Sequence, residues 1–224
     1  LVVYLPDVEP GWAVKAEKRL ATRIATTTEA ALAFLPRAKT VVTGYPVREA
    51  FAAATRAGAR ARFELPAGEK VLLVFGGSKG AQSINRAIAA DIARLTAHCV
   101  VVQVTGATNW DEIAAAHAAL PEPSRARWRI FKYLHEEMAD ALAAADLVVC
   151  RSGASSLGEL PYVGLPAILV PYPYAWRYQK VNAQYLVARG AAEMLEDGAL
   201  AAQLAARVSA LMQDTQALAA MRAA

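Results

Sequence analysis

The sequence predicts an α/β fold built on a doubly wound, Rossmann-like parallel sheet. From about Glu69 onward, short strands alternate with helical patterns, and the strands are continuous apolar runs. Strict alternation requires crossover connections and places helices on both faces of a parallel sheet. Strands that are apolar at every position are expected where both faces are covered. Ligands of such a sheet bind beyond the carboxyl ends of its strands.

The elements from residue 66 onward follow one another without a break in this pattern. Val71–Phe75 (VLLVF) is a buried-strand run that ends at Gly76-Gly77. Further strands are expected at Val100–Val104, Arg129–Phe131, Leu147–Cys150 and Ala167–Val170, with a short apolar piece at Ala191–Leu195. Helices are expected at Ala81–Leu95, Trp110–Leu120, Glu136–Ala145, Ser155–Val163, Gln179–Arg189 and Asp197–Met212.

The first 65 residues differ from this pattern. We expect helices at Trp12–Leu20 and Glu29–Phe34, extended segments at Ile24–Thr27 and Val41–Thr43, and a surface helix and linker over Ala53–Pro66. The expected organisation is therefore the end of a preceding domain and a linker over residues 1–65, followed by a Rossmann-like domain over residues 66–224. Since the chain starts at Leu1 and not at methionine, we expect that Leu1 is not a native N-terminus.

The composition excludes several classes of protein. Of the 224 residues, 56% are hydrophobic, but 52 are alanine, so bulky apolar residues make up about a third of the chain. That supports a normal core and excludes disorder. No apolar run reaches the roughly 18 residues of a membrane span. A net charge of +4 is too small to indicate a nucleic-acid partner, and two cysteines cannot form a disulfide scaffold.

Two glycine-containing turns follow strands of the predicted sheet. The first is Gly76-Gly77-Ser78-Lys79-Gly80, and the second is Arg151-Ser152-Gly153-Ala154-Ser155-Ser156 with Glu159 one turn into the next helix. Glycines let the backbone approach an anion, and helix N-termini offer unpaired N–H groups to it. The first turn matches neither a Walker A loop nor G-x-G-x-x-G. A serine-capped strand–helix turn and a Ser156–Glu159 capping box remain alternatives, but two such turns in one sheet favour a nucleotide.

Two further segments carry polar residues to the same edge. The loop Pro171–Asn182 follows a strand, and its amide side chains Gln179 and Asn182 suit sugar hydroxyls. Packing against another domain is the alternative role of its aromatic residues. Thr43–Arg48 contains a Gly and a Pro that can direct Arg48 at a phosphate, although a solvated arginine has the same sequence.

A metal site is not indicated by the sequence. His98, His117 and His135 lack metal-ligand spacing, and no Asp-x-Asp pair is present to hold a metal diphosphate. Cys99 and Cys150 adjoin or end apolar strands and are interpreted as core thiols.

Three segments together resemble the MurG family of N-acetylglucosaminyltransferases that act on undecaprenyl-diphosphate-linked muramyl-pentapeptide in peptidoglycan synthesis. They are GGSKGAQSINRAI, ADLVVCRSGASSLGELPYVGLPAILVPYPYAWRYQKVNA and TGYPVR. The resemblance runs from about Val8 to about Met212. It implies a GT-B fold, in which the carboxyl-terminal domain holds the sugar nucleotide and the amino-terminal domain holds the acceptor.

The resemblance also implies roles for particular residues. Arg48 and Ser78 would lie near the diphosphate, with Lys79 replacing a common loop glutamine. Leu134, His135 and Glu136 would lie beside the uracil, and Glu159 would hold the ribose. Ala154, Ser155 and Ser156 would line the diphosphate and its turn. Tyr178 and Gln179 would face the N-acetylglucosamine where some members carry a glutamine pair, and Asn182 would support that loop.

The implied reaction is inverting transfer of N-acetylglucosamine from its UDP derivative to the lipid-linked acceptor, without metal or cofactor. The catalytic base and a peripheral contact with the cytoplasmic membrane face are expected on the amino-terminal domain, whose glycine loop and histidine have no counterpart here. Three alternatives stay open: a UDP-sugar-binding module inactive without an acceptor domain, a related glycosyltransferase with another acceptor, and a dinucleotide-binding Rossmann domain.

Overall fold

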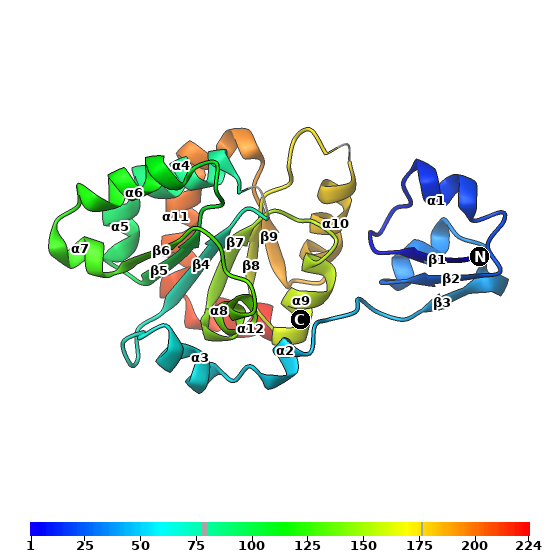
Figure 1. Cartoon of the computed structure of the whole chain (residues 1–224), viewed down its shortest axis with the longest axis horizontal. Helices are drawn as coiled ribbons and strands as arrows, with labels where there is room; N and C mark the ends of the chain where they lie inside the picture. The colour runs from blue at the N-terminus through cyan, green and yellow to red at the C-terminus, as the bar shows by residue number, and fades with distance from the viewer. Residues whose placement is uncertain (78–79, 176) are drawn as a thin grey trace.

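The computed structural model describes residues 1–77, 80–175 and 177–224, and it contains two separate parallel sheets (Figure 1). The smaller, three-stranded sheet has the order β1-β2-β3, and the larger, six-stranded sheet has the order β6-β5-β4-β7-β8-β9. The smaller sheet comprises β1 (Val2–Leu5), β2 (Arg23–Thr26) and β3 (Thr40–Val42). The larger sheet comprises β4 (Val71–Phe75), β5 (Val100–Val104), β6 (Trp128–Phe131), β7 (Leu147–Cys150), β8 (Ala167–Leu169) and β9 (Ala192–Met194).

The larger sheet has the strand order of a doubly wound fold. Its chain runs outward from β4 to β6, returns to β7 beside β4 and continues outward to β9. The order therefore reverses between β4 and β7, which is the position where ligands of such sheets bind. The parallel α/β architecture predicted from the sequence is confirmed.

Helices cover both faces of the larger sheet. One face carries α4 (Gln82–Ala90), α5 (Ile92–Thr96), α6 (Trp110–Ala118), α11 (Leu200–Gln213) and α12 (Thr215–Ala223). The other carries α2 (Ala50–Ala53), α3 (Arg56–Arg62), α8 (Glu137–Ala144), α9 (Ser156–Val163) and α10 (Tyr178–Val187). Short helices complete the chain: α1 (Trp12–Glu17), α7 (Glu122–Ala126), η1 (Glu29–Ala33), η2 (Arg37–Lys39) and η3 (Asp197–Ala199).

Strand β4 shows how the two faces share the core. Val71 and Leu73 point into the core under α8 and α9, whereas Leu72 and Val74 point into the core under α4 and α11. All four side chains have 0% exposure. This is why the strand reads as a continuous apolar run, since alternate residues are buried by opposite layers of helices.

Several expected boundaries are wrong. Strand β1 was not expected. It lies at the edge of its sheet with Val2 exposed, and it is a strand only because it pairs with β2, which is distant in the sequence. The single helix expected over Ala81–Leu95 is divided at Asp91, which caps α4 and precedes α5. The last expected helix starts as the 3-10 turn η3, and α7 and α12 are additional.

The helices α2 and α3 pack on the larger sheet and not on the smaller one. Phe51 and Leu65 belong to the core on the α8–α9 face. Arg56 pairs with Asp146 at 2.7 Å, and α3 lies along α8. The extended chain before α2 is therefore the connection between the two sheets, as Figure 1 shows. None of the described helices is long and apolar enough to cross a membrane.

Candidate functional site

A cleft of about 730 Å³ opens at the carboxyl ends of β4, β7 and β8. It lies at the point where the strand order reverses, as expected for a ligand site. Three of the four predicted segments meet there, namely the two glycine turns and the loop after β8, whereas no residue of Thr43–Arg48 lines the cleft. The cleft is lined by Phe75, Gly76, Gly77, Gly80, Ala81, Gln82, Ser83, Thr108, Asn109, Arg151, Gly153, Ser155, Tyr172, Pro173, Tyr174, Gln179 and Asp197.

The turn after β4 requires its glycines. A Cβ on Gly76 would lie 2.2 Å from the backbone nitrogen of Ala81, and a Cβ on Gly80 would lie 2.2 Å from the carbonyl oxygen of Thr105. Gly80 also has a φ of +79°, in the left-handed region. Asn85 of α4 donates a hydrogen bond to the same Thr105 oxygen at 2.9 Å and so ties this helix to β5. The turn is thus held close against the end of β5, with the start of α4 beside the cleft.

Two of the residues expected at the diphosphate, Ser78 and Lys79, lie outside the described residues.

The turn after β7 presents Ser155 to the cleft. Ser155 is the N-cap residue of α9, but its side chain makes no capping hydrogen bond. The Ser156 hydroxyl instead donates to the carbonyl oxygen of Gly153 at 2.6 Å. The alternative capping box between Ser156 and Glu159 is therefore not formed. Ala154, between these residues, does not line the cleft.

Arg151 is the main polar residue of the cleft that the sequence reasoning left without a role. Its guanidinium pairs with Asp197 at 2.5 Å, donates to the Ser83 hydroxyl at 2.8 Å and lies over the ring of Tyr172 at 5.3 Å. Its side chain is only 11% exposed. Arg151 therefore joins α4, the loop after β8 and η3 at one point of the cleft wall. The sequence feature that could have indicated a site role for Arg151 is its position directly after a buried strand.

Of the two residues of α10 that were expected to face the sugar, one lines the cleft and the other points away from it. Gln179 lines the cleft, and its side-chain oxygen accepts a hydrogen bond from the Tyr172 backbone at 2.9 Å. The hydroxyl of Tyr178 instead lies beside Gly11, where an added Cβ would be 3.6 Å from it. Tyr178 does not line the cleft.

Asn182 is fully buried where α10 meets the residues that follow β1. Its side-chain oxygen accepts from the Val8 backbone at 3.1 Å, and its nitrogen donates to Asp7 at 2.7 Å and to the Ser152 carbonyl at 3.2 Å. It therefore connects the smaller sheet to the turn after β7.

The remaining expected residues lie outside the cleft: Arg48 in the extended chain 43–49 between β3 and α2 (hereafter the linker), Leu134 and His135 after β6, and Glu159 in α9. Arg48 donates to the His135 carbonyl at 3.2 Å, and its guanidinium lies over the Phe51 ring at 5.5 Å. Leu134 and His135 line a separate hollow of about 460 Å³, with Tyr133 stacked on His135. Burial raises the pKa of the Glu159 carboxyl above its ordinary value, and the nearby Arg48 opposes that shift.

The buried cysteines are not nucleophiles at neutral pH. Burial raises the pKa of Cys99 to about 12, and burial followed by the charge of Glu159 raises the pKa of Cys150 to about 12. The residues that the structure describes contain no group of three or more His, Cys, Asp or Glu side chains arranged to hold a metal ion.

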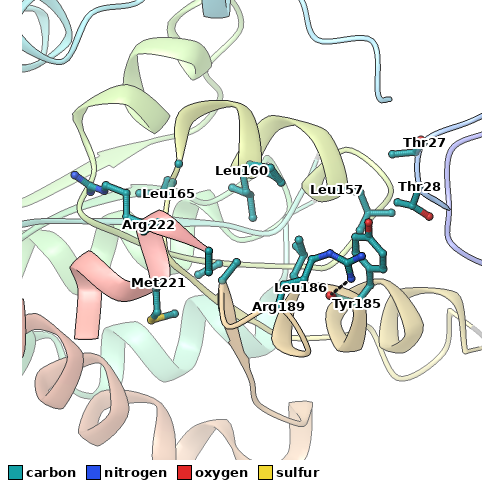
Figure 2. Close-up of a pocket in the computed structure, with 16 residues that line it drawn as sticks. Thr27, Thr28, Leu157, Leu160, Leu165, Tyr185, Leu186, Arg189, Met221 and Arg222 are labelled. Carbon is teal, nitrogen blue, oxygen red and sulfur yellow. Dashed lines mark hydrogen bonds between the residues drawn. The ribbon is translucent and has the colours of Figure 1, made fainter. Parts of the chain in front are cut away.

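A second cavity, of about 410 Å³, lies between the smaller sheet and helices α9, α10 and α12 (Figure 2). Leu157, Leu160 and Leu186 line it, and Thr28 closes one end. It contains none of the expected site residues.

Solved structures share this arrangement of two sheets. The chain superimposes on MurG of Acinetobacter baumannii with a TM-score of 0.73 at 22% identity, covering 99% of this chain and 61% of that one. It superimposes on a UDP-GlcNAc 2-epimerase from Neisseria meningitidis bound to UDP-GlcNAc with a TM-score of 0.70 at 12% identity, covering 98% and 64%. The fold is thus the GT-B architecture expected from the sequence.

The chain belongs to glycosyltransferase family 28, since the model of the family's C-terminal domain matches residues 71–224. A Roseiflexus sp. (strain RS-1) protein is 43% identical over 89% of this chain and 53% of its own length. A Desulforudis audaxviator protein is 42% identical over 100% and 61%. Both are named UDP-N-acetylglucosamine--N-acetylmuramyl-(pentapeptide) pyrophosphoryl-undecaprenol N-acetylglucosamine transferase.

The resemblance to the MurG family is therefore confirmed. The chain spans about half to three-fifths of the length of these curated relatives.

Proposed function

We propose that this chain forms the donor side of an enzyme that transfers N-acetylglucosamine from its UDP derivative to a lipid-linked muramyl-pentapeptide. The observation that carries the proposal is the cleft at the strand-order reversal of a family 28 sheet, where two glycine turns meet the starts of α4 and α9. The names of the curated relatives supply the donor and the acceptor.

The cleft residues suit the departure of a diphosphate. In the proposed reaction an acceptor hydroxyl forms a bond to the anomeric carbon, and the bond from that carbon to the diphosphate breaks, so UDP leaves with the electron pair. Negative charge grows on UDP, and fixed N–H dipoles and cations stabilise it. From the cleft, the glycine backbone at Gly76, Gly77 and Gly80 and the start of α9 at Ser155 would supply this stabilisation. The guanidinium of Arg48 would add to it from outside the cleft. We assign the base that takes the hydroxyl proton to no residue of this chain.

The nucleoside would be held beside α9. Glu159 would accept hydrogen bonds from the ribose diol, and the backbone of Leu134 and His135 would lie at the uracil. Gln179 would face the sugar from the cleft wall. Tyr178 and Asn182, which contact the smaller sheet, would act on the sugar only through the position of α10.

The experiment that tests the proposal is calorimetric titration of the purified chain with UDP, UDP-N-acetylglucosamine, UDP-glucose and NAD. We expect saturable binding of UDP and of its N-acetylglucosamine derivative, with weaker binding of UDP-glucose. Binding of NAD without UDP would support the dinucleotide-binding alternative and refute the proposal.

A transfer assay with the lipid-linked muramyl acceptor separates the remaining alternatives. Transfer identifies the enzyme, whereas UDP-sugar binding without transfer identifies a donor-binding module. Transfer only to a different glycolipid identifies a related glycosyltransferase. Because the proposed acceptor is lipid-linked, we expect the reaction at the cytoplasmic face of the membrane through a peripheral contact.

A further inference from the structure

Gly158 of α9 is in close contact with the linker. A Cβ built on Gly158 would lie 2.2 Å from Cβ of Tyr45 and 2.6 Å from Cγ. These atoms form the root of the tyrosine side chain, so they cannot move away without moving the linker backbone. Glycine is a poor helix former, by about 1 kcal/mol relative to alanine inside a helix. The close approach of Tyr45 gives a physical reason for glycine at this position.

A second contact follows one helical turn later. Phe51 of α2 is 3% exposed, and its ring packs edge-on against Tyr162 of α9 at 6.2 Å. Because residues four apart lie on the same helix face, Gly158 and Tyr162 form one strip along α9. The linker and the helix that follows it therefore contact this strip at two points, through Tyr45 and through Phe51 of α2.

Arg48 lies in the chain between these two points. Its guanidinium lies over the Phe51 ring and donates to the His135 carbonyl. The other side of the strip carries Glu159, the next residue after Gly158 in α9. The proposed phosphate ligand Arg48 thus lies close enough to the proposed ribose ligand Glu159 for its charge to act on that carboxyl.

We propose that Tyr45 is a positioning residue of the donor site. Seated on Gly158, it docks the linker onto α9 and holds Arg48 in register with Glu159. This inference rests on the proposed UDP-sugar function of the site. It adds that the close fit between Tyr45 and Gly158, which are 113 positions apart in the chain, determines the position of the residues that bind the donor.

The charges around the contact agree with this role. Burial raises the pKa of the Tyr45 hydroxyl, and the neighbouring Glu159, Tyr4 and Asp7 raise it further, while Arg48 lowers it. The charged or titratable groups that act on Glu159, or on which Glu159 acts, come from two elements. Arg48 and Tyr45 belong to the linker, and Cys150 lies at the end of β7. Tyr45 is neutral at pH 7, so it lies near the Glu159 carboxylate without adding a charge there.

The first test is a thermal-unfolding cycle of Gly158→Ala in two backgrounds. With Tyr45 present, the added methyl group overpacks the contact, and we expect the melting temperature to fall by roughly 2–10 °C. With Tyr45→Gly, which removes Cβ as well as the ring, the same change only improves a helical position, and we expect a rise of about 1–4 °C. Gly198→Ala is the control, because its Cβ would meet nothing within 4 Å. Equal effects of Gly158→Ala in both backgrounds would overturn the contact.

The second test is UDP affinity as a function of pH. We expect Tyr45→Ala to weaken UDP binding at least about threefold, within the range of coupling between contacting residues, and Tyr45→Phe to leave it within about twofold. Burial raises the pKa of Glu159, and we expect removal of the nearby tyrosine ring to reduce that burial, so the loss of affinity at acid pH should move to lower pH in Tyr45→Ala. A purely structural role would weaken binding without moving this pH dependence.

The outcomes separate this inference from the function on which it rests. If the unmodified chain binds no UDP, the proposed function fails and the positioning role fails with it. If the unmodified chain binds UDP and Tyr45→Ala changes neither the affinity nor its pH dependence, the function stands and the positioning role is refuted.

Discussion

Replacing Glu159 by glutamine tests the proposed ribose contact directly, because the change removes the charge and keeps the length of the side chain. The carboxyl lies in the first half of α9, and its raised pKa arises from burial against the opposing effect of Arg48, with no hydrogen bond contributing. The carboxylate therefore retains its capacity to accept hydrogen bonds from a ligand. Hydrogen bonds from bound ribose hydroxyls would offset the free-energy cost of burying the carboxylate.

The expected size of the effect follows from that environment. Hydrogen bonds to a charged group contribute about 1.5–3 kcal/mol when buried, and the partial exposure of Glu159 reduces this to about 1–2 kcal/mol. That range corresponds to a rise in the dissociation constant of UDP of roughly 5- to 30-fold.

The pH dependence of the melting temperature provides a second, independent test. A carboxyl whose folded pKa is raised contributes stability below its unfolded pKa, and that stability is lost as pH rises through the folded pKa. The unliganded Glu159→Gln variant should therefore melt at a higher temperature than the unmodified chain at pH 7. The difference should vanish below the ordinary glutamate pKa of 4.5. The replacement should thus stabilise the free protein and weaken its complex with UDP.

The assay is isothermal titration with UDP from pH 5 to pH 8, paired with thermal unfolding of the free proteins. Because the UDP phosphates titrate identically in both, the difference between the two proteins isolates Glu159. Glu29→Gln, in η1 and exposed, is the matched control. A folded Glu159→Gln variant with UDP affinity within twofold of the unmodified chain would refute the ribose role.

Three further predictions concern the cleft and the core. Arg151→Met should lower the free energy of unfolding by about 1–3 kcal/mol in urea titrations, because it breaks a largely buried ion pair, and should weaken UDP binding; unchanged UDP affinity would show that the cleft wall does not depend on this side chain. Gly80→Ala should cost about 2–4 kcal/mol, because its Cβ would lie 2.2 Å from a carbonyl oxygen. Gly68→Ala, with the similar φ of +77° but nothing within 4 Å, should cost only about 1 kcal/mol, and equal melting temperatures of the two variants would contradict the steric argument. Cys99 and Cys150, with pKa values of about 12, should resist thiol reagents at pH 8 until the chain is unfolded, so rapid labelling of the folded protein would contradict their burial.

The parts of the fold that could be predicted are those set by local sequence. The run VLLVF becomes β4 with the predicted bounds, because both faces of the strand are buried. Ser155 and Gln179 reach the cleft because each follows a strand of a parallel sheet, and all such strands end at one edge. For other residues that no local pattern distinguishes, the proposed roles come from the MurG resemblance.

The parts that could not be predicted depend on contacts between distant segments. Arg151 and Asp197 meet because β7 and β9 lie in the same sheet, and nothing in either local sequence announces the pair. Tyr178 and Gln179 are adjacent in the chain, yet one lies against Gly11 and the other lines the cleft. Only the rotation of α10 about its axis decides this, and that rotation is set by packing and not by the sequence of the loop.

Helices α10 and α9 each carry a proposed donor ligand beside a residue that contacts a segment outside the larger sheet. Gln179 touches the cleft, while Asn182, less than one turn later, is buried between Val8 and the turn after β7. Glu159 belongs to the proposed nucleoside site, while Gly158 before it receives Tyr45 from the linker. Each helix that carries a proposed donor ligand is therefore also joined to a segment from outside the larger sheet. A change in the angle between the two sheets must move these contacts, and because protein interiors are close-packed, it must also move the donor ligands. Donor affinity should accordingly respond to substitutions at Val8 and Tyr45 that touch no part of the nucleotide.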